Sequence, residues 1–542
     1  MRIFLFLLMA GSWFASGGVH AAAASNSTTA QAQPSSESCE RLAKLELPHA
    51  SIRTAKAVAA GTFVGPPQPF TDADLSAFYK KLPAFCRIVV QGKPTPDSDI
   101  AIEVWMPLAG WNGRLQGLGN GGFAGIIDDF ELAAAIAKGY AAVATDAGHT
   151  GSPIDAAWAL GHPEKVADFG HRGIHEMTRL AKVVVQQFYG SGPQHSYFAG
   201  CSDGGREALM EAQRYPDDYD GILAGAPANY WTGLLSTAIV DTQALTANPA
   251  SFIPPAKIST ISNAVLAACD KLDGLSDGIL NDPRRCHFDP ASIECKAGED
   301  TDQCLSAPQV AALKTIYAGL HDSSGHLIFP GYLPGAEQGG GGWGLWITGP
   351  APGKSLLAFF GIGYFSNMVY EKRDWDYKTF LVDTGIEEAR KKTAGALDAV
   401  NADLSAFRAR GGKLIVYHGW DDPAIPALNT VNYYDEVIRK LGRANTDSFA
   451  RLYMVPGMQH CGGGPGPDNF GASGTWPSHD PEHNIRVALE TWVEKGTAPT
   501  TFIASKSLPA MTRPLCPYPQ SAKYKGSGDQ NSAENFVCAS PE

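Results

Sequence analysis

The chain has 542 residues, of which 44% are hydrophobic and 10% are aromatic, and its formal net charge is −12 at pH 7. A chain of this length buries a large core and leaves room for a sizeable insertion or a second domain. The acidic balance and the lack of a basic cluster argue against nucleic acid and against anionic membrane surfaces as partners.

The first residues have the pattern of a secretory signal peptide. Arg2 supplies a positive charge, residues 3–10 are apolar, and small residues follow up to a predicted cleavage site near Ala21, so the signal peptide is predicted to span 1–21. A membrane anchor is the alternative, but the apolar run is too short to cross a bilayer. Residues 22–37 are small and polar, and we expect a disordered leader there. The mature chain is therefore expected to be secreted or periplasmic, with no membrane association.

Ten cysteines behind a signal peptide predict disulfides, because the compartment is oxidising. Three pairs are near neighbours in the sequence and a fourth flanks the N-terminal region, namely Cys269 with Cys286, Cys295 with Cys304, Cys516 with Cys538, and Cys39 with Cys86. By elimination Cys201 would pair with Cys461. The sequence alone does not fix this connectivity, and two buried free thiols are the alternative.

Strands and helices alternate along two stretches of the chain, as the spacing of apolar residues indicates. In the first stretch we expect strands within 99–107, 113–125, 138–149, 195–200 and 219–227, and helices at 173–190 and 206–216. In the second stretch we expect strands within 411–426 and 450–464, and a helix at 481–496. This alternation is typical of an α/β fold with a mostly parallel sheet covered on both faces.

Residues 229–405 separate the two stretches and differ from them in character. They contain two of the cysteine pairs, a glycine-rich run and many aromatic residues. We interpret them as a lid domain inserted into a catalytic domain that comprises 38–228 and 406–542.

Residues 200–204, Gly-Cys-Ser-Asp-Gly, form the G-x-S-x-G pattern of a serine nucleophile on a sharp turn between a strand and a helix. A serine hydroxyl needs an adjacent base to take its proton. In hydrolases with an α/β fold, an acid and then a histidine follow the serine along the chain. Ser202 is followed by such an acid, Asp421 or Asp422, and then by His460. The position of Asp422 before a proline favours it only weakly.

Cysteines stand beside both the serine and the histidine. If Ser202 and His460 form a hydrogen bond, then Cys201 and Cys461 also lie close, near the Cα separation of about 4.4–6.8 Å that a disulfide needs. Such a bridge would clamp the nucleophile loop to the histidine loop, where small displacements of reacting groups are costly.

The chain resembles the tannase and feruloyl esterase family, a group of secreted α/β-hydrolases that includes hydrolases of mono(2-hydroxyethyl) terephthalate. The resemblance covers essentially the whole mature chain and rests on three motifs, at 200–206, 417–426 and 456–467. It implies an α/β-hydrolase fold with a large inserted lid domain. It also implies that Asp422 is the acid of the triad and that a disulfide joins Cys201 to Cys461.

The same resemblance implies a serine esterase that hydrolyses esters of aromatic acids such as gallate or ferulate through an acyl-enzyme, so the expected partner is a small aromatic ester. Ten aromatic residues between 343 and 380 offer flat, rigid walls for such an acyl group, although at least half of them are expected in the lid's own core. A hydrolase of the mono(2-hydroxyethyl) terephthalate type is an alternative within the family. A catalytically silent, calcium-stabilised binding module is an alternative of another class.

Ester hydrolysis builds negative charge on the carbonyl oxygen, which backbone N–H groups stabilise. One donor is expected to be the N–H of Asp203, the residue after the nucleophile. The glycine loop at 119–125 follows an earlier strand and would supply the other donor, from Gly121 or Gly122. An ordinary tight turn is the alternative interpretation of this loop.

Residues 269–286 place three aspartates and two glycines between two cysteines. Clustered carboxylates with backbone carbonyls between them suit a hard cation such as calcium, although the spacing is not that of an EF-hand. An acidic surface turn is the alternative. The family resemblance implies a structural calcium ion held by side-chain or backbone oxygens of Asp270, Asp273, Leu275, Asp277 and Ile279.

Overall fold

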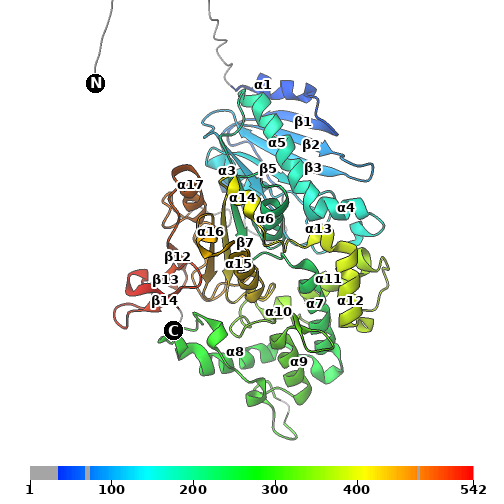
Figure 1. Ribbon diagram of the computed structural model, residues 1–542, viewed down its shortest axis with the longest axis vertical. Coiled ribbons are helices and arrows are strands. Elements are labelled where there is room, and N and C mark those ends of the chain that lie inside the picture. The colour runs from blue at the N-terminus through cyan, green and yellow to red at the C-terminus, as the bar shows by residue number, and fades with distance from the viewer. Residues whose placement is uncertain (1–33, 67–73, 300, 473–476, 541–542) are drawn as a thin grey trace, which may run out of the picture. The chain divides into compact units, whose positions relative to one another are not determined.

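The computed structural model describes residues 34–66, 74–299, 301–472 and 477–540 (Figure 1). The predicted signal peptide, 1–21, and most of the predicted leader lie outside the described residues. The end of the leader differs from the prediction, because Ser36 and Glu37 already belong to helix α1. Ser35 caps this helix in a capping box with Ser38, which stabilises its first turn.

A nine-stranded sheet forms the centre of the fold, with the strand order β1-β2-β3-β5-β4-β6-β7-β10-β11. Its strands are β1 Ala50–Val58, β2 Phe85–Gly92, β3 Ile100–Pro107, β4 Arg114–Leu118, β5 Ala141–Thr145, β6 His195–Cys201, β7 Gly221–Gly225, β10 Lys413–Gly419 and β11 Ala450–Val455. From β5 to β11 every pair of neighbours is parallel, whereas β1, β2, β3 and β5 pair antiparallel. The predicted α/β class with a mostly parallel sheet is confirmed.

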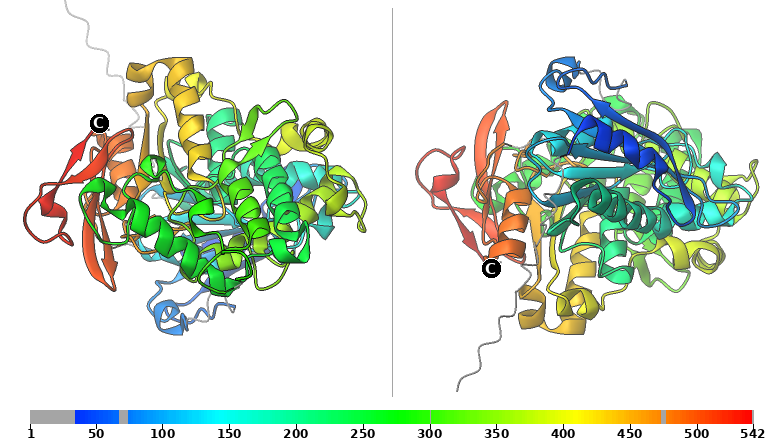
Figure 2. Two further views of the ribbon diagram at one scale, coloured as in Figure 1. Left: turned by 90° about the horizontal axis from the view of Figure 1, so that it is seen from below. Right: turned by 90° about the horizontal axis from the view of Figure 1, so that it is seen from above.

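Helices cover both faces of the sheet, as the views in Figure 2 show. The covering helices are α3 Asp129–Ala137, α5 Gly173–Tyr189, α6 Asp203–Arg214, α15 Ala427–Leu441 and α17 Ile485–Lys495. Two hydrophobic cores result, one on each face: α5, α6 and α15 contribute to the first, and α3 and α17 to the second. Neighbouring strand residues divide between the cores, because successive side chains point to opposite faces; Ile222 lies in the first core and Leu223 in the second.

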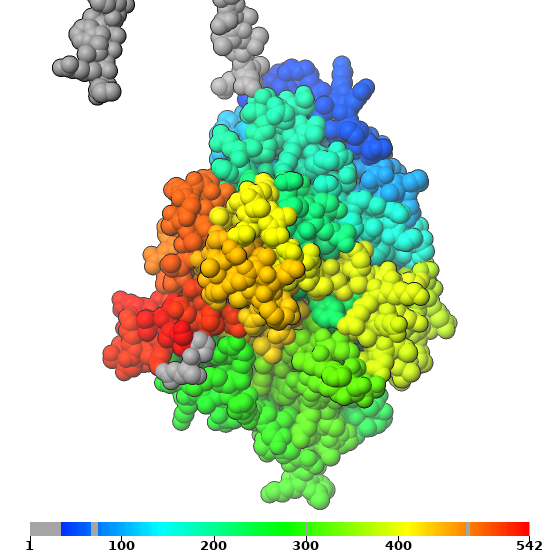
Figure 3. Space-filling view, in the orientation of Figure 1, coloured from blue at the N-terminus to red at the C-terminus, as the bar shows by residue number. Residues whose placement is uncertain are grey.

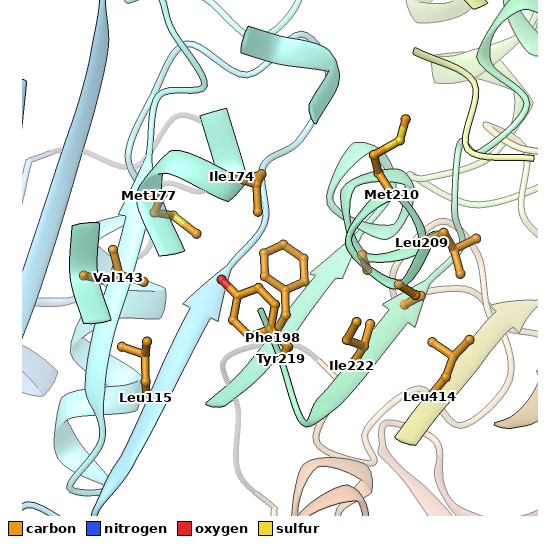
Figure 4. Close-up of a cluster of buried hydrophobic side chains, with 14 of the residues drawn as sticks. Leu115, Val143, Ile174, Met177, Phe198, Leu209, Met210, Tyr219, Ile222 and Leu414 are labelled. Atoms are coloured by element: carbon orange, nitrogen blue, oxygen red, sulfur yellow. The ribbon is translucent and has the colours of Figure 1, made fainter. Parts of the chain in front are cut away.

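The first core shows how the helices are held on the sheet. Ile174 and Met177 of α5 and Leu209 of α6 face strand residues such as Phe198 and Ile222 (Figure 4). All five side chains are almost completely buried. Burial of this apolar area is the main favourable term in folding and fixes the start of α6 against the end of β6.

Residues 229–405, the lid segment, contribute no strand to the nine-stranded sheet within the described part of the chain. Its main elements are α7 Trp231–Thr246, α8 Pro255–Cys269, α9 Ala307–Ala318, α10 Trp343–Trp346, α11 Leu356–Tyr364, α12 Val382–Ala389, and the short strands β8 Leu320–His321 and β9 Leu327–Phe329. The segment, green to yellow-green in Figures 1 and 3, gathers below the sheet in that view. Its interpretation as a domain of its own stays a prediction.

The remaining elements are short. They include α1 Ser36–Arg41, α2 Ser76–Tyr79, α4 Pro163–Ala167, α13 Gly395–Leu397, α14 Ser405–Ala409 and α16 Arg443–Asp447. Two antiparallel pairs close the chain, β12 Phe502–Ser507 with β13 Ala510–Leu515 and β14 Ser521–Tyr524 with β15 Phe536–Ala539. Within the described residues, no helix is both long and apolar enough to cross a membrane.

All ten cysteines are paired in five disulfides. The pairs are Cys39–Cys86, Cys201–Cys461, Cys269–Cys286, Cys295–Cys304 and Cys516–Cys538. These are the pairs that the sequence spacing and the family resemblance indicate. Five disulfides fit a protein that folds in an oxidising compartment.

The packing of α6 against the sheet predicts a sharp difference between two glycine substitutions. In Gly205→Ala the new methyl group would lie 2.2 Å from the carbonyl oxygen of Gly225, so we expect a loss of about 1–3 kcal/mol in the free energy of unfolding. Gly395→Ala is the matched control: Gly395 has a helical φ of −58° and no atom within 4 Å of the added carbon, so stability should be unchanged or slightly higher. Thermal and urea unfolding measure both. Equal destabilisation by the two changes would contradict this packing.

Candidate active site

Ser202 lies at the turn between β6 and α6, where the sequence predicts a nucleophile. Its backbone angles, φ 66° and ψ −120°, are rarely adopted by residues with a side chain. Glycines make the turn possible, since a methyl group at Gly200 would lie 2.5 Å from the carbonyl oxygen of Gly204. The Ser202 amide also donates to the carbonyl oxygen of Gly225, 3.0 Å away, which fixes the turn to β7. The serine is therefore held in one strained but well-supported position.

His460 follows β11 and approaches the serine from a distant part of the chain. Its Nε2 lies 2.9 Å from Ser202 Oγ, and its Nδ1 lies 2.8 Å from Asp422 Oδ2. In this pattern the serine hydroxyl donates to Nε2 and the Nδ1–H group donates to the carboxylate, as required of an imidazole that accepts a proton from serine. The three side chains predicted as a triad thus lie in one hydrogen-bonded chain.

The Asp422 carboxylate is completely enclosed, and donors surround it. Its Oδ1 accepts hydrogen bonds from the amides of Ala424, at 2.8 Å, and Ile425, at 2.9 Å. Burial alone would raise the pKa of Asp422, but the charge of His460 and hydrogen bonds from His418 and His460 hold it well below its usual range. The carboxylate therefore stays ionised and can stabilise a protonated His460.

Asp421, the competing acid, is buried but does not contact the histidine. Its Oδ1 has no hydrogen-bond partner within the described residues. Burial, followed by the charge of nearby Glu337, raises the pKa of Asp421 well above its usual value. The geometry thus separates the two neighbours: Asp422 turns to His460, and Asp421 turns to the lid segment near Gly335, where a methyl group would lie 3.4 Å from its Oδ1.

His418 is a member of this cluster that the sequence reasoning missed. It is completely buried at the end of β10, with Nε2 3.0 Å from Asp422 Oδ2 and 3.0 Å from the carbonyl oxygen of Ile425. Its Nδ1 lies 2.7 Å from Thr430 Oγ1, whose hydroxyl can donate to it. His418 therefore contacts Asp422 Oδ2, the same carboxylate oxygen that accepts the hydrogen bond from His460. The sequence feature that could have indicated this role is a histidine four residues before Asp422, in a strand whose other residues indicate only a buried hydrophobic core.

The Cys201–Cys461 disulfide joins the two loops that carry Ser202 and His460. Its sulfur atoms are 2.03 Å apart, its Cα atoms are 6.0 Å apart, and the closed loop spans 260 residues of sequence. Cys461 itself has a φ of 61°, so the backbone turns sharply directly after the histidine. The disulfide and the Ser202–His460 hydrogen bond therefore join neighbouring residues of the same two loops.

Two backbone amides lie beside the serine where an oxyanion would form. Asp203 and Gly122 both line the pocket that contains Ser202 and His460, whereas Gly121 does not. Neither amide donates to a backbone acceptor within the described residues. Gly122 needs its glycine, because its φ is +61° and a methyl group there would lie 2.2 Å from the carbonyl oxygen of Pro153. Of the two predicted glycines, the geometry favours Gly122.

The Asp203 side chain is paired with a buried arginine. Its Oδ1 lies 2.6 Å from Arg206 Nε, and both side chains are almost fully buried. Arg206 also donates to the carbonyl oxygens of Gly170, at 2.6 Å, and Phe169, at 3.0 Å. This buried pair ties the first turn of α6 to the π-helical turn Asp168–Arg172, which leads directly into α5.

A pocket of about 50 Å³ opens next to Ser202 and His460. The lid segment supplies six of its thirteen lining residues, and the full lining is Gly122, Ser202, Asp203, Ala228, Trp231, Leu234, Leu235, Trp346, Leu357, Phe360, Ala424, Ile425 and His460. The Trp346 ring stands edge to face with the His460 ring, with centroids 5.0 Å apart, and is nearly parallel to the Phe360 ring at 6.3 Å. Apolar walls of this kind suit a planar acyl group.

The predicted lid aromatics divide between two places. Trp346 and Phe360 reach the pocket. Four others are buried in the hydrophobic cores of the lid segment, namely Trp343, Tyr364, Phe365 and Phe380. Trp231, which also lines the pocket, lies outside the aromatic run that the sequence singles out. The packing of α7 near the serine brings Trp231 to the pocket, and no local sequence pattern indicates this.

The predicted calcium loop has its carboxylates in local backbone contacts. Asp270, Asp273 and Asp277 each accept a hydrogen bond from an amide of their own loop, at 3.0–3.2 Å. Burial and, after it, the charge of Asp277 raise the pKa of Asp270 and Asp273, that of Asp273 to about 6. Asp277 Oδ2 also accepts a hydrogen bond from Arg513 Nη2 at 2.9 Å.

Within the described residues, no three histidine, cysteine, aspartate or glutamate side chains converge closely enough to hold a metal ion. The donor chemistry of the three aspartates nevertheless fits a hard cation, because they offer only oxygen ligands and their carboxylates repel one another. The Cys269–Cys286 disulfide closes the loop at its base.

Comparisons with known proteins agree with the geometry of the serine site. Residues 86–539 match the family model described as tannase and feruloyl esterase. The chain is 40% identical to an uncharacterized esterase of Xanthomonas campestris pv. campestris, over 94% of this chain and 92% of that protein. It is 36% identical to the mono(2-hydroxyethyl) terephthalate hydrolase of Piscinibacter sakaiensis, over 82% of each. The crystal structure of feruloyl esterase B from Aspergillus oryzae superimposes with a TM-score of 0.84 at 28% identity, covering 93% of this chain and all of that one.

The position of the Cys201–Cys461 disulfide predicts that its removal affects turnover more than removal of a distant bridge. The double change Cys201→Ala with Cys461→Ala should lower kcat on an aryl ester at least tenfold, because the two loops lose their covalent register. Cys516→Ala with Cys538→Ala is the control, which should lower the melting temperature but leave kcat within about twofold. Assays are run well below both melting temperatures. An equal loss of kcat in the two variants would show that the first bridge has no positional role.

Proposed function

The chain belongs to the tannase and feruloyl esterase family, and from this membership and the serine site we propose that it hydrolyses esters of aromatic carboxylic acids through an acyl-enzyme. The observation that carries the proposal is the hydrogen-bonded chain from Ser202 through His460 to Asp422 at the wall of an apolar, aromatic-lined pocket. A carboxylic ester hydrolase requires both parts: an activated hydroxyl and a place for the acyl group.

In the first half of the reaction, Ser202 Oγ attacks the ester carbonyl carbon while its proton passes to His460 Nε2. Asp422 stabilises the imidazolium that forms and keeps Nδ1 protonated. The imidazolium then gives its proton to the alcohol oxygen, the bond between carbonyl carbon and alcohol oxygen breaks, and the acyl group stays on Ser202. His418 holds the Asp422 carboxylate in place during these steps.

The negative oxygen of the tetrahedral intermediate would lie between the amides of Asp203 and Gly122. Among the described residues neither amide has a backbone acceptor, and both residues line the pocket beside the serine. Fixed N–H donors at this position are typically worth a few kcal/mol each in the transition state. In the second half, water gives a proton to His460, attacks the acyl carbon, and releases the carboxylic acid as Ser202 regains its proton.

We also propose that the protein acts outside the cytoplasm, secreted or periplasmic. Five disulfides, one of them beside the serine, support an oxidising compartment. The signal-peptide pattern of residues 1–21 supports export.

A structural calcium ion is proposed for the loop between Cys269 and Cys286. The side chains of Asp270, Asp273 and Asp277 and the backbone oxygens of Leu275 and Ile279 would hold it. Support comes from the mutual repulsion of the carboxylates, which a cation would relieve. No step of the reaction involves this ion.

The proposed triad predicts a strong contrast between neighbouring acids. Ser202→Ala should abolish turnover of methyl benzoate and methyl cinnamate, with a loss of at least about 10⁴-fold in kcat. Asp422→Asn should cost a similar factor, because the wrong tautomer of His460 would then face the serine. Asp421→Asn is the matched control and should cost less than tenfold, since this carboxyl does not touch His460.

Steady-state kinetics on the purified mature chain measure the three variants. Turnover of every ester by Ser202→Ala at the wild-type rate would remove Ser202 from the mechanism. The absence of turnover by the folded wild-type chain would instead favour the silent binding module.

The proposed calcium site predicts stabilisation by the metal alone. Calcium added to the chelator-treated protein should raise the melting temperature by several degrees, because an ion at 100 times its Kd stabilises by about 2.7 kcal/mol. In Asp273→Asn the gain should largely disappear. In Asp217→Asn, whose side chain is 93% exposed elsewhere on the surface, it should persist. Differential scanning fluorimetry measures the shift, and an identical calcium effect in both variants would place the ion elsewhere.

A further inference from the structure

The walls of the pocket beside Ser202 are almost free of polar groups. Leu234 and Leu235 of α7 and Leu357 of α11 form an aliphatic side, and Trp346 and Phe360 form an aromatic side. The polar side chains of the lining are those of Ser202, His460 and Asp203. The first two belong to the hydrogen-bonded triad, and the third is buried against Arg206.

A buried positive charge, that of Arg206, lies behind the wall. The Arg206 guanidinium lies over the Trp231 ring at 5.4 Å and over the Phe169 ring at 4.8 Å, so the indole separates it from the pocket. It is fully buried, and it donates to Asp203 and to two carbonyl oxygens. No lysine or arginine is among the described residues that line the pocket. A carboxylate on the acyl ring would therefore be buried without a counter-charge.

Two buried acids also lie behind the walls. Asp241 lies on α7, seven residues after Leu234 and thus on the same face of the helix, and it is 3% exposed. Its Oδ2 has no hydrogen-bond partner within the described residues. Asp421 directly precedes Asp422 and is 2% exposed. Burial raises the pKa of both carboxyl groups well above the usual value, and neither group supplies a positive charge that could pair with an anionic acyl group.

Ring hydroxyls would find few partners. Among the described lining residues, the buried side-chain atoms without a hydrogen bond are Trp231 Nε1 and Asp203 Oδ2, too few for the three hydroxyls of a galloyl ring. A hydroxyl that loses its hydrogen bonds to water in such a pocket and gains none typically weakens binding about 10- to 100-fold.

We infer that this pocket selects a neutral aryl acyl group without ring hydroxyls, of the benzoyl or cinnamoyl kind, over galloyl groups and over aryl groups with a second, ionised carboxylate. The inference rests on the proposed esterase function, and it names the acyl class for that site. It separates this chain from a hydrolase whose substrate carries a free carboxylate, as mono(2-hydroxyethyl) terephthalate does.

Matched esters test the inference on the purified mature chain. Dimethyl and monomethyl terephthalate differ in one ionised carboxylate, and methyl benzoate and methyl gallate differ in three hydroxyls. Each kcat/KM is divided by the ester's rate of hydrolysis by hydroxide, which removes differences in intrinsic reactivity. We expect monomethyl terephthalate to be at least 100-fold poorer than the dimethyl ester, and methyl gallate to be at least tenfold poorer than methyl benzoate.

Equal or reversed preferences, with turnover abolished in Ser202→Ala, would overturn the inference and leave the esterase function standing. No turnover of any of the four esters by the folded wild-type chain would overturn the proposed function itself. The two failures are thus distinguished within one set of assays.

A variant tests whether the acyl group lies against this wall. Leu357→Arg should raise the ratio of kcat/KM for monomethyl over dimethyl terephthalate at least tenfold, because it supplies the missing positive charge. Leu357→Met, which keeps the volume and stays neutral, should leave the ratio within twofold. An unchanged ratio in a folded Leu357→Arg variant that still hydrolyses the dimethyl ester would mean that the acyl ring lies elsewhere. If the arginine prevents folding, the wild-type preferences still decide the inference.

Discussion

The hydrogen bond between Ser202 Oγ and His460 Nε2 connects two loops that lie 258 residues apart in sequence, and the rest of the site depends on it. A contact between such distant segments must overcome the entropy of closing a long loop. Three features favour it here: the parallel strands β6, β7, β10 and β11, which end at the same edge of the sheet, the Cys201–Cys461 crosslink, and the buried carboxylate of Asp422, which is hydrogen-bonded to His460. Together these features fix the imidazole. The strands and the crosslink set its position, and the hydrogen bond to Asp422 sets its ring orientation and its tautomer.

Much of this arrangement could be predicted from the sequence, because the signals are local. Period-two and helical spacing of apolar residues located the parallel strands from β4 onward and the helices α5, α6 and α17, whereas α3 and α15 were not predicted. The G-x-S-x-G turn marked the end of β6, since only glycines allow its close contacts. The acid was harder to choose: Asp421 and Asp422 are neighbours, and only the three-dimensional path of the loop turns one of them to His460.

What the sequence left out depends on tertiary contacts. β1 at the antiparallel edge and β12 after residue 500 carry mixed patterns, because their side chains are only partly buried. β2 was also not predicted, although most of its residues are buried. His418 resembles any buried strand residue until Asp422 is placed beside it. Trp231 becomes part of the pocket only through the packing of α7. The calcium loop shows the reverse case, since its local pattern is clear whereas its carboxylates do not converge on one point in the described structure.

The division of the pocket between two parts of the chain has a consequence for how such a site can evolve. The side chains that would touch the far end of an acyl group belong mostly to α7, α10 and α11, whereas the groups that move protons lie on loops of the central sheet. Substitutions in the three helices can therefore alter the acyl preference without disturbing the reaction centre. A change of acyl preference can thus arise on one side of the reacting carbonyl while the chemistry on the other side stays the same.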